Sequence, residues 1–114
     1  MRLLLLFFML FCATILLGCN QIKSKVTIYN ESKETLELVK VTIAFHEFEF
    51  KKISPNARRV ALFEANDSSY VVFVRFSSGK ILRFSGGYVT GGLAYNDRLN
   101  ISENEIRLKS LISD

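Results

Sequence analysis

The chain has 114 residues, a hydrophobic content of 49% and a formal net charge of +4. This length is enough for one small domain and excludes a second independent hydrophobic core. The charge is only weakly positive, so the composition gives no reason to expect a nucleic-acid partner. The N-terminal residues differ in character from the remainder, because they contain almost no polar side chains.

The first 18 residues have the layout of an export signal. Arg2 supplies a short positive segment, residues 3–17 form an apolar run, and Gly18 ends it. A helix that spans the hydrocarbon core of a membrane needs about 20 apolar residues. The run is shorter than that, and Asn20 follows it closely. We therefore expect a cleaved N-terminal signal helix over residues 1–18 and no transmembrane span.

This segment ends in the motif Leu16-Leu17-Gly18-Cys19. The motif resembles the lipobox of bacterial lipoprotein precursors, in which the signal peptide is cut before the cysteine. The resemblance implies that Cys19 carries a thioether-linked diacylglycerol and an acylated amino group. Two or three acyl chains hold a protein on a membrane far more firmly than one chain does. The alternative is an ordinary secretory signal with an unrelated cysteine after the cleavage site.

Processing at this motif would determine the cellular location, the net charge and the free thiols of the remaining chain. Asn20 stands where many lipoproteins of the inner membrane have Asp, which favours the outer membrane and a place in the cell envelope. Cleavage leaves 96 residues, and the loss of Arg2 lowers the net charge to +3. Cys12 is removed and Cys19 is committed to lipid, so no disulfide can form.

Short alternating segments follow a polar tether at residues 19–24 and predict a β-sandwich domain over residues 25–110. Apolar residues recur with a period of two, and turn-forming Asn, Ser, Asp and Gly separate the segments. No helical period appears. The predicted strands cover residues 26–29, 36–45, 47–51, 58–64, 70–76, 80–85, 98–101 and 106–109.

The alternation also predicts which side chains face the core. In the second segment the apolar phase changes, which indicates a bulge near Leu38 and Val39. In the fourth segment we expect Val60 and Leu62 to point inward. Residues 70–76 are apolar on both faces, as a central strand is.

Seven to eight strands without a helix predict an all-β fold, a small antiparallel immunoglobulin-like β-sandwich. A small open barrel is the alternative. Four short motifs occur at residues 26–32 (V-x-I-x-N-x-S), 36–43 (L-x-x-V-x-V-x-I), 67–70 (D-S-S-Y) and 86–90 (G-G-Y-V-T). Through them the chain resembles small bacterial lipoproteins with an immunoglobulin-like domain. The resemblance implies this fold and an envelope address, and it implies no known activity.

A glycine-rich segment interrupts the alternation after the sixth predicted strand. It lacks the Lys-Ser/Thr pair of a phosphate-binding loop, and no helix follows it. Paired glycines permit a bulge or a turn with positive φ. The alternative is an interaction loop, and its candidate residues are Gly86, Gly87, Tyr88, Thr90, Gly91, Gly92 and Tyr95.

Catalytic groups are scarce, because the chain has one histidine and no thiol remains after processing. We expect His46 in the tight turn before the third strand. Glu47 and Glu49 share a strand face at a spacing compatible with some glycosidase pairs. They alternate with Phe48 and Phe50, so they face water when the phenylalanines face the core, and a solvated glutamate lacks the raised pKa of a general acid. The sequence therefore predicts no enzyme, no metal site and no cofactor.

Basic residues flank a turn at residues 54–55. Lys51 and Lys52 precede it, and Arg58 and Arg59 follow it. The ordinary interpretation is a solvated rim. The functional hypothesis is a basic patch that contacts anionic lipid headgroups or cell-wall polymers, since the tether holds the domain close to a charged surface.

Together these features predict a lipid-anchored, non-enzymatic envelope protein with a structural role or with a protein or polymer partner. Contact with the membrane is through the N-terminal lipid, and no nucleic acid or metal is expected. The alternative is a small-ligand-binding periplasmic lipoprotein that uses the region from Gly86 to Tyr95. That alternative requires an apolar pocket larger than about 300 Å³ beside this region.

Overall fold

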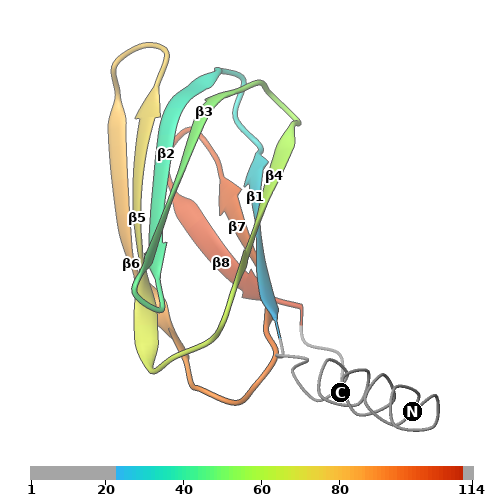
Figure 1. The fold of residues 1–114 in the computed structure, drawn as a ribbon. Coiled ribbons are helices and arrows are strands. Elements are labelled where there is room, and N and C mark those ends of the chain that lie inside the picture. The colour runs from blue at the N-terminus through green and yellow to red at the C-terminus, as the bar shows by residue number, and fades with distance from the viewer. Residues whose placement is uncertain (1–22, 112–114) are drawn as a thin grey trace, which may run out of the picture.

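Eight strands form two sheets that pack face to face (Figure 1). The computed structural model describes residues 23–111, and every regular element within this range is a strand. The strands are β1 (Ser24–Asn30), β2 (Leu36–Ile43), β3 (His46–Ile53), β4 (Arg58–Phe63), β5 (Ser68–Phe76), β6 (Ile81–Val89), β7 (Asn96–Ile101) and β8 (Ile106–Ser110). The all-β sandwich predicted from the sequence is confirmed.

The strand order is β4-β1-β7-β8 in one sheet, sheet A, and β3-β2-β5-β6 in the other, sheet B. All neighbouring strands are antiparallel except β1 and β7, which are parallel. In the constant-type immunoglobulin domain, the first, second, fifth and fourth strands form one sheet in that order, so the first strand pairs with the second. Here it lies between the fourth and the seventh. The likeness to immunoglobulins is therefore one of architecture, with a different strand order.

Inward side chains of both sheets form the core. Val26 and Ile28 of β1 are fully buried against Val72, Val74 and Phe76 of β5 and their neighbours. Burial of each such side chain contributes about 1.5–3 kcal/mol. β5 lies between β2 and β6, as expected for the most apolar segment.

The prediction for the inward face of β4 was wrong. Val60 and Leu62 are exposed, and Ala61 and Phe63 are buried in their place. Both phases of this segment contain apolar residues, so alternation alone does not decide between them. The ring of Phe63 packs edge-on against Tyr70, with centroids 6.3 Å apart, and the larger aromatic residue takes the core position.

The bulge predicted in β2 is present and begins one step earlier than expected. The register with β5 shifts between Leu36 and Leu38. As a result Leu38 and Val39 are both buried, although they are adjacent in the chain. A one-residue bulge thus reconciles the two apolar phases of this strand.

The turn between β2 and β3 lies before His46. β2 ends at Ile43, and Ala44 and Phe45 form the turn with φ angles of 52° and 66°. His46 is the exposed first residue of β3 and not a turn residue as expected. Positive φ at both central positions is the geometry of a two-residue hairpin turn, for which Asn-Gly is preferred.

The first glycine pair does not interrupt the sheet as predicted, since β6 continues through it to Val89. Ser68 lies opposite Val89 and Tyr70 lies opposite Gly86, so β6 has one extra residue at this bulge. Gly87 has a φ of 69°, and a Cβ atom there would clash with Leu108 Cδ2. Glycine at this position permits both the bulge and the close packing of β8.

The sandwich has two ends with different loops (Figure 1). We call the end at which β1 begins the near end, and its loops are residues 44–45, 64–67 and 90–95. At the far end the loops are residues 31–35, 54–57, 77–80 and 102–105. A strand rises about 3.3 Å per residue, so β1 alone separates the two ends by roughly 20 Å.

Candidate functional site

The predicted lipidation motif, Leu16, Leu17, Gly18 and Cys19, lies outside the described residues, as does the signal peptide. Within residues 23–111, no helix has the length and apolar character needed to cross a membrane. β1 begins at Ser24, five residues after Cys19. The chain that leads from this motif therefore joins the sandwich at its near end.

The structure divides the glycine-rich segment between β6 and the near-end loop at residues 90–95. The Tyr95 hydroxyl accepts a hydrogen bond from Thr90 N at 3.0 Å and lies 3.1 Å from Thr90 Oγ1. Gly91 N donates to Asp67 Oδ1 at 3.2 Å. Tyr95 thus holds its own loop, whereas Tyr88 is exposed and available to a partner.

The basic residues lie at the far end. Lys51 and Lys52 belong to β3 in sheet B, and Arg58 and Arg59 belong to β4 in sheet A. The Arg58 guanidinium lies over the Tyr29 ring, 5.0 Å from its centroid. The four side chains are therefore divided between two sheets, roughly 20 Å from the start of β1. They lie at the end opposite the predicted anchor, a position that fits the solvated rim of the ordinary interpretation better than the alternative hypothesis of contact with lipid headgroups.

A hollow of about 380 Å³ lies on the outer face of sheet A. Asn100 of β7 lies opposite Arg107 of β8, and Arg98 lies opposite Lys109. Alternate residues of a strand share one face, so these side chains project together. The lining consists of Glu31, Arg98, Asn100, Arg107, Leu108 and Lys109, with three cations and one carboxylate.

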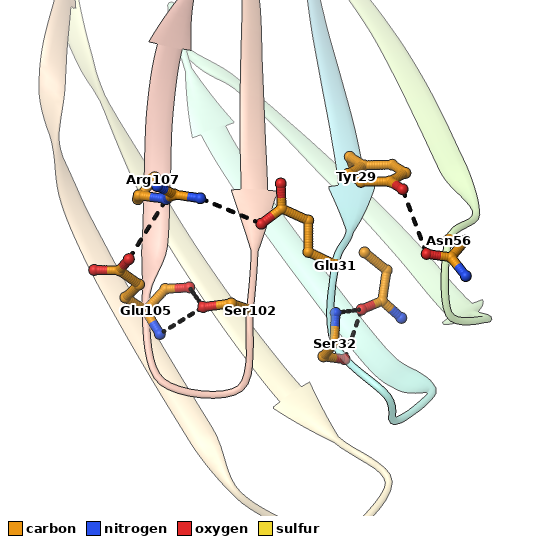
Figure 2. Close-up of polar contacts among 8 residues, drawn as sticks. Tyr29, Glu31, Ser32, Asn56, Ser102, Glu105 and Arg107 are labelled. Atoms are coloured by element: carbon orange, nitrogen blue, oxygen red, sulfur yellow. Dashed lines mark hydrogen bonds and ion pairs between the residues drawn. The ribbon is translucent and has the colours of Figure 1, made fainter.

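Two carboxylates hold the side chain of Arg107 (Figure 2). Its Nη2 lies 3.4 Å from Glu31 Oε2, and its Nε lies 3.4 Å from Glu105 Oε1. Among the ion pairs of residues 23–111, none includes Arg98 or Lys109. The net positive charge of the hollow is therefore carried by these two side chains.

Three buried polar atoms of β7, two of them in residues that line the hollow, have no hydrogen-bond partner among residues 23–111. They are Asn96 Oδ1, Arg98 Nε and Asn100 Oδ1. Asn100 is only 6% exposed, and leaving a buried polar group unpaired costs about 1–3 kcal/mol. A donor and acceptors that the protein leaves unpaired, next to a net positive charge, are features of a ligand site.

Sequence reasoning missed this hollow. The segments 98–101 and 106–109 were recognised only as strands, although Asn96, Arg98 and Asn100 form a polar row at a period of two. The row becomes a site because β7 is a central strand, paired with β1 and β8, which no local pattern reveals. The hollow is polar and includes no residue from Gly86 to Tyr95, so it is not the apolar pocket that the small-ligand alternative required.

A buried tyrosine and aspartate join the two sheets near the glycine bulge. Tyr70 Oη donates to Asp97 Oδ2 at 2.7 Å. Burial, and next this hydrogen bond, raise the pKa of Tyr70 far above its ordinary value. The phenol therefore remains a neutral donor, and the pair links β5 to β7 inside the core.

Comparison with known proteins supports the fold. No family model matches the chain, and no curated protein sequence is similar to it. Among solved structures, the chain is similar to the NMR structure of a protein from Eubacterium rectale, with a TM-score of 0.54 and 14% sequence identity. The match covers 81% of this chain and 91% of that one. At this identity the likeness shows the fold alone.

Proposed function

We propose that this chain is a lipid-anchored protein of a bacterial cell envelope whose sandwich domain binds an anionic partner and catalyses no reaction. The anchor is Cys19, and the outer membrane is its expected location. The observation that carries the binding role is the polar hollow on sheet A, where Arg98 and Lys109 supply positive charge and Asn100 supplies an unpaired acceptor.

The anchor is supported by the agreement of the Leu16-Leu17-Gly18-Cys19 motif with the start of the domain. The first described strand begins at Ser24, immediately after the predicted tether, and the first described core residue is Val26. Removal of residues 1–18 therefore leaves every described strand intact. Cleavage before Cys19 is compatible with folding of the whole sandwich.

Metabolic labelling with a radioactive fatty acid tests the anchor. Wild-type protein is expected to incorporate label, whereas Cys19→Ser is expected to incorporate none. Cys12→Ser is the matched control, because Cys12 lies within the segment that cleavage removes. Equal labelling of wild type and Cys19→Ser would contradict lipidation at this residue.

The partner that best fits the hollow is an anionic, hydroxyl-bearing saccharide or polyol polymer. A phosphate or carboxylate oxygen pairs with the cations of Arg98 and Lys109. A neighbouring hydroxyl can hydrogen-bond the amide of Asn100, which lines the hollow and whose buried Oδ1 has no partner among residues 23–111. Such a ligand satisfies both the charge and the buried polar atoms, and neither catalysis nor a cofactor is needed.

Calorimetric titration with glycerol-phosphate oligomers, with neutral dextran as the uncharged comparison, tests this binding role. Wild-type protein is expected to bind only the phosphate polymer. Arg98→Gln is expected to weaken binding about tenfold, since a charge-assisted hydrogen bond contributes about 1.5–3 kcal/mol. Arg75→Gln, at an exposed position of β5 in sheet B, is the matched control. Equal loss in both variants would indicate a diffuse charge effect and no site.

A further inference from the structure

Exposed apolar side chains are concentrated at the near end of the sandwich. Seven large apolar side chains are exposed among residues 23–111. The four most exposed are Phe45 at 86%, Tyr88 at 63%, Leu62 at 60% and Leu93 at 57%. Phe45 and Leu93 lie in near-end loops, and Leu62 and Tyr88 are each the penultimate residue of a strand that ends there.

Phe45 occupies a position that folding alone does not favour. It has a φ of 66° in the two-residue turn between β2 and β3. Such turns prefer Asn and Gly, and a bulky residue in this conformation is uncommon. The ring is almost fully exposed, so it gains no burial in return. The hairpin itself therefore offers no reason for an aromatic residue at its tip.

Hydrogen bonds join the near-end loops to one another. Ala44 N donates to Ser68 Oγ at 2.8 Å, and Gly91 N donates to Asp67 Oδ1 at 3.2 Å. The turn at residues 44–45, the loop before β5 and the loop before β7 are thus connected. Phe45 and Leu93 therefore lie in loops that hydrogen bonds support at the same end, so little ordering of the backbone is required when they bind.

Charge at the near end is balanced. Its cations are Lys23 and Lys25 at the start of the described chain and Lys109 near the end of β8. Its anions are Glu47 near the start of β3, and Glu64 and Asp67 in the loop between β4 and β5. Three cations and three anions give this end no strong preference for an anionic surface. Apolar contact is its distinctive property.

The anchor places this end at the membrane. From Cys19 to Ser24 the backbone spans at most about 17 Å, so a lipid on Cys19 keeps the start of β1 close to the bilayer. Amphipathic tyrosine and apolar side chains are favoured at the boundary between headgroups and acyl chains.

We propose that the near end of the sandwich docks on the bilayer surface, with Phe45, Tyr88 and Leu93 inserted at the interface. This inference rests on the proposed lipid anchor at Cys19. Docking directs the far end away from the membrane. The outer face of sheet A then lies between the two ends and remains open to the solvent.

Single tryptophan probes test the docking, because the chain contains no tryptophan of its own. The lipidated protein with Phe45→Trp is reconstituted into phosphatidylcholine vesicles and floated on a density gradient. Its emission is expected to shift to shorter wavelength and to be quenched by lipids that carry a quencher on the acyl chain. Ile81→Trp is the matched control, because Ile81 is an exposed apolar residue at the far end. Its emission is expected to remain that of tryptophan in water and to be quenched by iodide.

Flotation reports the anchor and tryptophan emission reports the docking, so the two proposals fail in different ways. If the protein floats and both tryptophans are quenched equally by iodide, docking is overturned and the anchor stands. If the protein does not float, the anchor is contradicted and the docking falls with it.

A second measurement uses residues 19–114 with Cys19→Ser, which lack both the apolar signal segment and the lipid, so that only the domain surface can bind. Phe45→Ser and Leu93→Ser are each expected to weaken its partition into phosphatidylcholine vesicles about tenfold, as loss of an inserted apolar side chain requires. Addition of phosphatidylglycerol to the vesicles is expected to change the partition less than threefold, because charge at this end is balanced. Partition unaffected by either serine variant would overturn the proposal.

Discussion

Both ends of the sandwich combine hairpin turns with loops that cross between the two sheets, but the two ends have different chemistry. At the far end, polar atoms of one loop bind those of the next. Lys33 N donates to Glu103 Oε1 at 2.9 Å, and Ser78 N donates to Glu34 Oε1 at 3.0 Å. At the near end the loops are also joined, but they expose apolar side chains. The difference teaches that one end is suited to water and the other to a surface that excludes water.

The far end depends most on Asn30, which is fully buried. Its Nδ2 donates to the carbonyl oxygens of Glu34 and Ile53 at 2.8 and 3.0 Å, and its Oδ1 accepts bonds from Ser32 N and Oγ at 2.9 and 2.6 Å. Asn30→Ala leaves several of these groups unpaired and is expected to lower the free energy of unfolding by about 3 kcal/mol. Urea denaturation measures the change.

Asn104→Ala is the control for this prediction. Asn104 is exposed in another far-end loop, and its loss is expected to cost less than about 0.5 kcal/mol. A loss below about 1 kcal/mol in the Asn30 variant would show that the polar contacts of the far end contribute little.

The near end depends on Gly87 for its shape. Gly87→Ala places a methyl group in the left-handed region of φ and against Leu108, so we expect a loss of about 1–3 kcal/mol. Gly91→Ala is the control, because its added Cβ atom makes only ordinary contacts, at 3.6 Å or more. Thermal unfolding of both variants measures the difference, and equal melting temperatures would refute the structural role of the bulge.

Phe45 sharpens the comparison, because its replacement is expected to raise the stability of the domain and to weaken its binding to membranes. Phe45→Gly relieves positive φ in the turn and is expected to raise the free energy of unfolding in solution by about 0.5 kcal/mol. The same variant is expected to bind vesicles more weakly. A variant that is less stable in solution would mean that the aromatic ring supports the fold.

The smallest predicted effect is a dependence of far-end stability on pH. The hydrogen bond from the side chain of Ser78 is the main cause that holds the pKa of Glu34 below its ordinary value. A lowered pKa in the folded state stabilises the fold above the pKa of an unfolded glutamate, about 4.3, and the contribution is lost as pH falls through the folded value.

Glu34→Gln tests this dependence. The variant is expected to be slightly less stable than wild type at pH 7 and equal to it at pH 2. Both are compared by thermal unfolding at each pH. An equal difference at the two pH values would show that the charge of Glu34 is not responsible.

Local patterns predicted the strands but not their arrangement. Alternation located all eight, and the phase change in β2 revealed its bulge. It placed Val60 and Leu62 on the wrong side, because both phases of β4 contain apolar residues and only the packing of Phe63 on Tyr70 decides between them. The glycine pair suggested an end to β6, since sequence does not show that Leu108 packs against it.

The candidate site was less predictable than the fold. Arg98 and Lys109 are brought together by antiparallel pairing, and Glu31 joins them because β1 and β7 run in parallel. Neither pairing leaves a local signal. The concentration of apolar side chains at the near end likewise depends on topology, because Phe45, Tyr88 and Leu93 belong to different hairpins and loops.

The position of β1 has a consequence for the time at which this protein folds. β1 is the first of the described strands to be synthesised, yet its partners are β4 and β7. The last residues of β7, at Asn100 and Ile101, pair with Tyr29 and Asn30. Sheet A is therefore incomplete until almost all of the described chain is available, and such distant pairing is slow to form. Slow closure of this sheet suits the proposed export, which requires an unfolded chain.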